Sequence, residues 1–470
     1  MKFNLNNNLI QRRLLLKMSG MSAIGAAAAQ LSGCFDSSKA PAAPVPASAV
    51  PTPVVTPAPV LKNSYQQQNL VGSNASYAAT FTDASFVNAW GIAIRPKGAG
   101  GHFWVGAGGA SFQYVGDVKA SKTSNLAVLS QDGLKVVTVP GADARTDDAS
   151  KGKITGVVFN GAELDSKHFR VNGQTATQTT TQGVVKTKFD GSARFVFVTD
   201  SGKVSAWTDR SSTGEIVRVD GAAQEKYDGG ADGSAFFGAA VKTDTWDTLW
   251  LADFGAKPRI VTLDENWKKV PTVGFVNPFG SGASSADGVK SVVPGDPVPF
   301  NIQVLDGSVF VTYAISRANP KKGAPKDSFY AAEEDALDAA AETASGDKPN
   351  KGKLVEFSLA GQLIRIFDDA LRLNAPWGLA IAPADFGRLS GAVLVGNFGG
   401  AGRICAFKRD TGVYLDDVRD KAGKPMGIAG LWGLQFGNGE SLGDSHALYF
   451  AAGPEDEKAG LFGSLRYAAA

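Results

Sequence analysis

A five-residue pattern occurs six times in this 470-residue chain and limits its fold more than any other feature. A copy has an aromatic residue (threonine in the second copy), a small one, an apolar one, a small or polar one, and an apolar one. Two further apolar runs ending in turns follow each copy, and successive copies lie 55 to 82 residues apart. A strand–turn–strand unit repeated in this way predicts an all-β, six-bladed β-propeller. The copies are Trp90–Ile94, Thr155–Phe159, Phe237–Val241, Phe300–Val304, Trp377–Ile381 and Trp432–Phe436.

The same pattern predicts the innermost strand of each blade, because these strands converge where neighbouring blades leave little room. Alternation with a period of two would put small side chains such as Gly91 and Ala93 on one face. Bulky side chains such as Trp90, Ile92 and Ile94 would then pack between sheets. The repeated tryptophans that we expect to mark the start of an innermost strand are Trp90, Trp377 and Trp432.

A ring of blades must also close. The run YQQQNLVG at Tyr65–Gly72 precedes the first copy and has no partner of its own. We expect it to form the outer strand of the last blade, beside Leu461–Tyr467, which would remove free sheet edges. The propeller is therefore expected over residues 63–470, with an insertion at about 316–350 whose segment Phe329–Ala344 has the composition of a short acidic helix.

The first 33 residues resemble a twin-arginine export signal that ends in a lipoprotein box. The pair Arg12 and Arg13 precedes three leucines, and a short, mildly apolar stretch ends in Leu-Ser-Gly-Cys at Cys34. That stretch is too short to span a bilayer. We expect export, cleavage before Cys34 and acylation of its thiol, which places the protein on a membrane of the bacterial cell envelope, periplasmic or outer-membrane.

Residues 34–62 alternate proline and alanine with small residues and predict a disordered, extended tether. Removal of the first 33 residues, which carry four basic residues and no acidic one, changes the formal charge from +2 to −2. A nearly neutral chain gives no electrostatic basis for binding nucleic acid. The expected partners are the membrane, through the lipid, and a protein or small molecule.

Several segments resemble a family of secreted bacterial propellers. The stretches NAPWGLAIAPADFG, PFNIQ, VFVTYA and LWGLQFGNG are similar to NHL-like proteins that carry an Asn-Pro-Trp-Gly-Ile-Ala motif. The resemblance runs from about Tyr65 to Tyr467 and is strongest after residue 295. This chain lacks the proline before Trp90. The resemblance implies the propeller fold and no activity, because the family is uncharacterised.

Polar residues recur at one position of three blades and suggest a site at one mouth of the channel. Asp200, Asp253 and Asn397 follow the second strand of their blades, and Asn88 and Asn374 precede Trp90 and Trp377. Such residues form turns through their own side chains, which is one interpretation. The other is a ligand or a cation such as Ca²⁺, held by convergent oxygens.

These features favour a binding or scaffold module over an enzyme. The three histidines show no metal-ligand spacing, and the string GESLG at Gly439–Gly443 lacks the strand–turn–helix context of a hydrolase. The alternative is a metal-dependent hydrolase of the lactonase or esterase propeller type. It requires acid and amide oxygens that converge at one mouth beside a protonatable base.

Overall fold

The computed structural model describes residues 61–142 and 152–468. Arg12, Arg13, Cys34 and all but the last two residues of the expected tether lie outside these ranges. Within them the regular secondary structure is almost entirely β-strand, and the longest α-helix, α1, covers only Ala339–Ala344. No helix in these ranges combines the length and the apolar character needed to cross a membrane.

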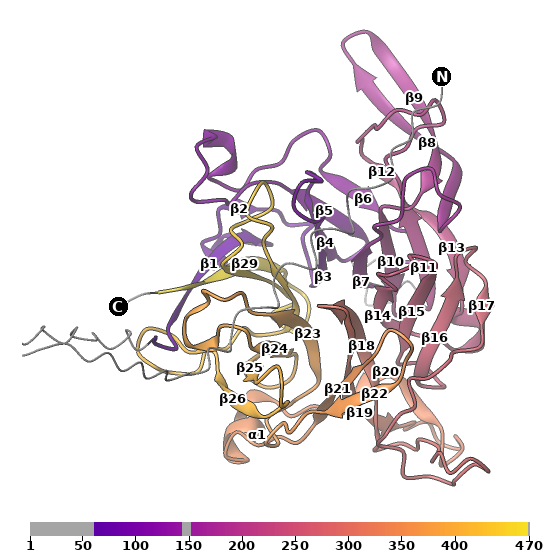
Figure 1. Cartoon of the computed structure of the whole chain (residues 1–470), viewed down its shortest axis with the longest axis vertical. Coiled ribbons are helices and arrows are strands. Elements are labelled where there is room, and N and C mark those ends of the chain that lie inside the picture. The colour runs from indigo at the N-terminus through magenta and orange to yellow at the C-terminus, as the bar shows by residue number, and fades with distance from the viewer. Residues whose placement is uncertain (1–60, 143–151, 469–470) are drawn as a thin grey trace, which may run out of the picture. The chain divides into compact units, whose positions relative to one another are not determined.

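Six sheets follow one another around a common axis (Figure 1) and confirm the six-bladed propeller. The first blade has β3 (Ala89–Ala93), β4 (Phe103–Ala107), β5 (Ala110–Tyr114) and β6 (Val136–Thr138), with β12 (Gly221–Ala222) parallel to β6. The second has β7 (Ile154–Phe159), β10 (Phe195–Thr199), β11 (Lys203–Trp207) and β13 (Gln224–Asp228). A separate hairpin, β8 (Arg170–Thr180) and β9 (Gly183–Ser192), projects from this blade. The third has β14 (Phe236–Val241), β15 (Thr248–Asp253), β16 (Arg259–Asp264) and β17 (Lys269–Val270).

The remaining blades follow the same order from the axis outward. The fourth has β18 (Pro297–Leu305), β19 (Ser308–Ala318), β21 (Gly352–Phe357) and β22 (Leu363–Ile366), with β20 (Phe329–Glu334) paired to the end of β19. The fifth has β23 (Pro376–Ile381), β24 (Val393–Asn397), β25 (Ile404–Phe407) and β26 (Tyr414–Asp417). The sixth has β27 (Leu431–Phe436), β28 (Ala447–Ala452), β29 (Leu461–Tyr467), β1 (Tyr65–Gly72) and β2 (Phe81–Thr82). Short 3₁₀ turns lie at Ala75–Tyr77, Ser124–Leu126, Gly230–Asp232 and Gly387–Leu389.

Each copy of the five-residue pattern lies on an innermost strand, as predicted. The innermost strands contact one another in the order β3, β7, β14, β18, β23 and β27, and β27 contacts β3 to complete the ring. The closing strand is also confirmed. β1 pairs antiparallel with β29 from Tyr65 opposite Tyr467 to Gly72 opposite Leu461.

The second position of the pattern is small because the innermost strands approach each other there. A Cβ atom on Gly91 would lie 2.6 Å from the backbone nitrogen of Val157, on β7. On Gly378 and Gly433 it would lie 2.3 Å from the carbonyl oxygens of Trp432 and Trp90, on the next strand of the ring. These distances are shorter than real Cβ contacts, so the neighbouring backbones could not pack as they do around a larger residue.

The position of the aromatic residues differs from the sequence interpretation. Ile92 does pack between the first and last blades, but Trp90 stacks on Trp432, with 3.3 Å between ring centroids, and meets Trp377 edge-on at 5.9 Å. Contacts between residues of different blades place these rings at the axis. The cause is a β-bulge at the start of each innermost strand, which breaks the alternation of the strand. We call the resulting cluster the aromatic plug; it comprises Trp90, Phe237, Phe300, Trp377 and Trp432.

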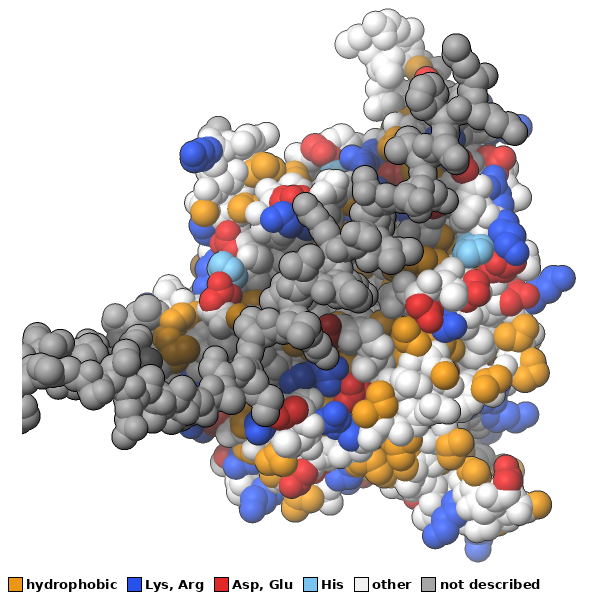
Figure 2. Space-filling view, viewed as in Figure 1, with side chains coloured by type: hydrophobic (Ala, Val, Ile, Leu, Met, Phe, Trp, Pro, Cys, Tyr) orange, Lys and Arg blue, Asp and Glu red, His pale blue; other side chains and the backbone are white. Residues whose placement is uncertain are grey.

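The insertion in the fourth blade is only partly helical, which corrects the expectation for Phe329–Ala344. Its first residues form β20, because β19 continues past the blade to Ala318 and offers a strand to pair with, so that Ala318 lies opposite Phe329. The helix α1 begins only after Asp338, whose side chain accepts a hydrogen bond from the backbone N–H of Ala341. Figure 2 shows acidic and basic side chains interspersed over the described residues of the face in view.

Candidate functional site

The polar residues that follow the second strands of three blades lie at the plugged end of those blades. Asp253 pairs with Phe236 at the start of β14, and Asn397 pairs with Pro376 at the start of β23. Asp200 follows the last residue of β10, opposite the start of β7. The three side chains therefore share one end of the propeller but belong to three different blades.

Each of these side chains is engaged by its own blade. Asp253 Oδ1 accepts hydrogen bonds from the backbone N–H groups of Ala235 and Gly255, each at 3.0 Å, and its Oδ2 accepts one from Ser234 Oγ at 2.9 Å. Asp200 Oδ1 accepts one from the backbone N–H of Lys153 at 2.6 Å. This is the bonding of turn-forming residues.

The three asparagines are also hydrogen-bonded, and Asn374 reaches the insertion of the neighbouring blade. Asn88 Oδ1 accepts a hydrogen bond from Trp90 Nε1 at 2.7 Å, which fixes the first tryptophan of the plug. Asn397 Oδ1 accepts one from the backbone N–H of Asn374 at 3.0 Å, so these two are brought together. The amide of Asn374 in turn bonds both backbone groups of Leu337, in the segment before α1.

Burial affects both carboxylates at this end, since Asp253 is buried and Asp200 is partly buried. Burial raises the pKa of Asp253 above its ordinary value, although hydrogen bonds from Ala235, Ser234 and Gly255 lower it. Burial likewise raises the pKa of Asp200, against the opposing effect of Lys153. Among the described residues, no group of three or more histidine, cysteine, aspartate or glutamate side chains is placed to hold a metal ion.

We therefore expect Ca²⁺ to leave the melting temperature unchanged. Asp253→Ala should lower the free energy of unfolding by about 1–3 kcal/mol, because three buried donors lose their acceptor. Differential scanning calorimetry with Ca²⁺ and with chelator measures both effects, with the exposed Asp327→Ala as the matched control. A Ca²⁺-dependent rise that disappears in Asp200→Asn/Asp253→Asn would instead establish the cation site.

The plugged end is further covered by the insertion. Phe329 and Ala332 of β20 pack against the aromatic plug, and the backbone N–H of Ala332 donates a hydrogen bond of 3.0 Å to the carbonyl of Phe254. Phe254 and Phe398, which follow Asp253 and Asn397, also pack against the plug. The end of the channel where a ligand was expected is thus filled with side chains.

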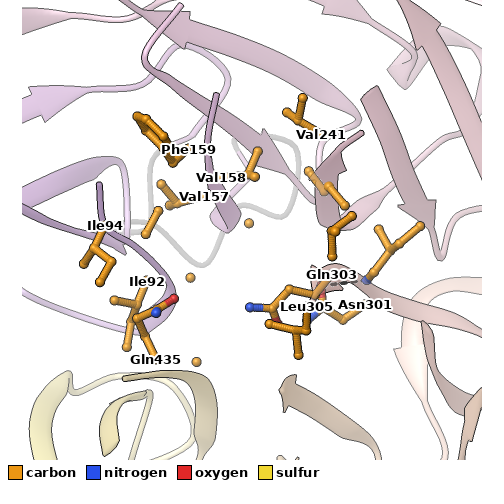
Figure 3. Close-up of a pocket in the computed structure, with 18 of the residues that line it drawn as sticks. Ile92, Ile94, Val157, Val158, Phe159, Val241, Asn301, Gln303, Leu305 and Gln435 are labelled. Atoms are coloured by element: carbon orange, nitrogen blue, oxygen red, sulfur yellow. Dashed lines mark hydrogen bonds between the residues drawn. The ribbon is translucent and has the colours of Figure 1, made fainter. Parts of the chain in front are cut away.

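The hollow part of the channel lies beyond the plug, towards the opposite ends of the innermost strands (Figure 3). This cavity has a volume of about 280 Å³, and Trp377 of the aromatic plug is one of its lining residues. Its lining residues Ile94, Phe159 and Leu305 are only partly buried, so the cavity opens to solvent at this end. The channel is therefore blind, closed by the plug and open opposite to it.

The cavity wall is mostly apolar, with three amide side chains. Gln303 on β18 and Gln435 on β27 point into the cavity in Figure 3, and Gln435 Nε2 donates to the carbonyl of Phe436 at 3.0 Å. Asn301 replaces the usual glycine, and its Nδ2 donates to the carbonyl of Trp377 at 2.8 Å across to the next blade. An apolar pocket with a few polar groups is the usual form of a small-molecule site.

Sequence reasoning did not single out these glutamines, although the repeat contains the signal. The fourth position of the pattern is alanine or valine in four copies and glutamine at Gln303 and Gln435. A polar residue where a repeated strand position is otherwise apolar marks a place where that strand meets water or a ligand.

Comparisons with known proteins identify relatives but no activity. No family model matches the chain. One uncharacterized protein of Acanthamoeba polyphaga mimivirus is 31% identical over 219 residues, which are 47% of this chain and 49% of that protein. A second from the same virus is 27% identical over 397 residues, covering 84% of this chain and 79% of its own length. The chain thus spans about half the length of the first relative and most of the second.

Solved structures with a similar arrangement are distant. The outer coat vertex of COPII on membranes shares 8% identity over 80% of this chain and 84% of that chain, with a TM-score of 0.34. A gluconolactonase from Xanthomonas campestris shares 13% identity over 58% of this chain and 82% of its own, with a TM-score of 0.31. Similarity at this level carries no argument about the function of this chain.

Proposed function

We propose that this protein is a binding module whose blind central channel holds a small, largely apolar molecule. The observation that carries the proposal is the composition of the cavity wall: it is apolar apart from Thr243, the Trp246 indole, the amides of Asn301, Gln303 and Gln435, and backbone groups. None of the described lining residues has an acidic, basic or thiol side chain. General acid–base or nucleophilic catalysis needs such groups within hydrogen-bond reach of the substrate, so the wall favours binding over hydrolysis.

A neutral fluorescent probe, N-phenyl-1-naphthylamine, tests this function directly. We expect the probe to bind with enhanced fluorescence, and Gln303→Trp to abolish the enhancement, because the indole would fill the space into which the amide points. The matched control is Val273→Trp, at a side chain that is 78% exposed and outside the cavity wall. Equal probe binding by both variants, with unchanged melting temperatures, would refute the channel as the binding site.

The site of action that we propose is the bacterial envelope. The support lies in the sequence alone: the pair Arg12 and Arg13, the short apolar stretch and the box ending at Cys34. The resemblance to secreted bacterial NHL-like propellers agrees with an exported protein. The proline- and alanine-rich residues 34–62 would hold the propeller away from the membrane to which the acylated cysteine attaches it.

Cys34→Ala should release the protein from the membrane fraction into the soluble one, because attachment depends on the buried acyl chains. Fractionation of cells that express the full chain, followed by immunoblotting, measures the distribution. Ser38→Ala, four residues into the tether, is the control and should stay with the membrane. Membrane association that survives loss of Cys34 would contradict the lipid anchor.

A further inference from the structure

The polar side chains of the cavity wall gather towards its open end. Gln303 and Gln435 occupy the fourth position of the five-residue pattern, and Thr243 and Trp246 lie beyond the end of β14. The third position, one residue nearer to the plug, contributes only apolar residues: Ile92, Val157, Ala239, Ile302 and Leu434. Apart from Asn301, the side chains of the wall are thus apolar towards the plug and polar but uncharged towards the solvent.

The two glutamines keep hydrogen-bonding groups that a ligand could use. Their amides point into the cavity in Figure 3, and the amide of Gln303 makes no hydrogen bond with residues 61–142 or 152–468. Gln435 Nε2 donates to the carbonyl of Phe436, which leaves Oε1 and a second N–H. Asn301, deeper in the cavity, uses both ends of its amide: Nδ2 donates to the carbonyl of Trp377 and Oδ1 accepts from the backbone N–H of Ile302, each at 2.8 Å.

Trp246 lines the open end in a backbone conformation that a bulky residue rarely adopts. Its φ of 57° lies in the left-handed region. The indole extends from the third blade to Gly161, just past the end of β7 in the second blade, where a Cβ atom would lie 2.5 Å from Trp246 Cζ2. A strained tryptophan and a glycine that leaves room for it therefore place an aromatic ring beside the opening, and backbone strain of this kind is concentrated at binding sites.

The charged residues that flank these wall segments are paired with other residues of the chain. Lys242 Nζ lies 3.6 Å from Asp244 Oδ1, and the buried Arg95, which follows Ile94, lies 2.7 Å from Asp209. None of these four charged residues lines the cavity. A charged head group would therefore lose its hydration here without gaining an ionic partner in the described wall, whereas a hydroxyl can exchange water for an amide.

We propose that the ligand of the channel is a neutral amphiphile: a hydrocarbon chain with an uncharged head group that carries hydroxyls. The chain would lie against the apolar wall towards the plug, and the head group would bond Gln303 and Gln435 at the open end, beside the ring of Trp246. This inference rests on the proposed function, since it names the class of ligand for the same cavity. Burial of the chain supplies most of the affinity, and the two amides select the head group.

Displacement of N-phenyl-1-naphthylamine by 1-decanoylglycerol, methyl decanoate and decanoate tests the proposal, because the three share one acyl chain. We expect the glyceride to bind wild-type protein about threefold to tenfold more tightly than the methyl ester, which lacks the hydroxyls, and decanoate to bind most weakly. Gln303→Met/Gln435→Met removes both amides and keeps side chains of similar length. It should bind the glyceride no better than the methyl ester, while probe binding changes little. Gln178→Met, at an exposed position of β8, is the matched control.

The outcomes separate this inference from the proposed function. If the probe binds but the three compounds displace it equally, or if decanoate displaces it best, the neutral head group is wrong and the channel is still a binding site. If the double variant keeps the order of affinities shown by wild-type protein and by Gln178→Met, the glutamines do not select the head group and the inference fails. A probe that does not bind wild-type protein refutes the proposed function itself. Melting temperatures show whether a variant is folded, and the order of affinities in wild-type protein tests the proposal without any variant.

Discussion

Deletion of Tyr65–Gly72 should abolish the cooperative unfolding of the propeller. This strand, β1, completes the last blade through its antiparallel ladder with β29. It buries Tyr65, Leu70 and Val71, and Tyr65 Oη donates a hydrogen bond of 2.7 Å to the carbonyl of Phe386 in the fifth blade. Burial of three such side chains contributes about 1.5–3 kcal/mol each, comparable with the whole stability of many domains.

A single substitution gives the same test with less perturbation. Val71→Asp places a carboxylate where the side chain is fully buried and paired opposite Phe462, and should lower the free energy of unfolding by about 3 kcal/mol or more. Gln66→Asp, on the same strand at an exposed position, should have little effect. Urea denaturation followed by tryptophan fluorescence measures both. Closure by another segment would be indicated if Val71→Asp unfolded at the same urea concentration as Gln66→Asp.

The propeller fold was predictable from the sequence because each blade carries one copy of the repeat, and these copies place a small residue where neighbouring blades meet. A small residue after the aromatic one, seen at Gly91, Gly378 and Gly433, reports the close approach of neighbouring backbones. The alternating pattern could not predict the β-bulge at the start of each innermost strand. A bulge shifts the phase of a strand by one residue, so Trp90 turns from the space between sheets to the axis.

The same bulges explain why the sequence did not predict what surrounds the candidate residues. Asp200, Asp253 and Asn397 do share one end of the propeller, but the aromatic plug and β20 fill the space between their blades. Arg95, after β3, forms an ion pair of 2.7 Å with Asp209, after β11. Nothing in the sequence spacing of these two residues indicates that they meet, because only the arrangement of blades around the axis brings them together.

Because the innermost strands approach closely, replacing one of their glycines by alanine should strongly destabilise the propeller. Gly378→Ala would place Cβ 2.3 Å from the carbonyl oxygen of Trp432 and 2.9 Å from Leu434 Cγ. The Trp432 oxygen belongs to the backbone of β27, so no change of rotamer can relieve that contact. The two blades must separate, which should lower the free energy of unfolding by about 3 kcal/mol or more.

Gly133→Ala is the matched control, since a Cβ atom there would meet nothing within 4 Å and its φ is not positive. It should leave stability unchanged or raise it by up to about 1 kcal/mol, because alanine restricts the unfolded chain. Gly433→Ala, whose Cβ would lie 2.3 Å from the carbonyl oxygen of Trp90, should behave like Gly378→Ala. Both ring glycines should also weaken binding of N-phenyl-1-naphthylamine, because the strands that they separate form the cavity wall. If Gly378→Ala and Gly133→Ala melt at the same temperature, the innermost strands do not pack as closely as described above. Close packing would then not explain why the second position of the repeat is small.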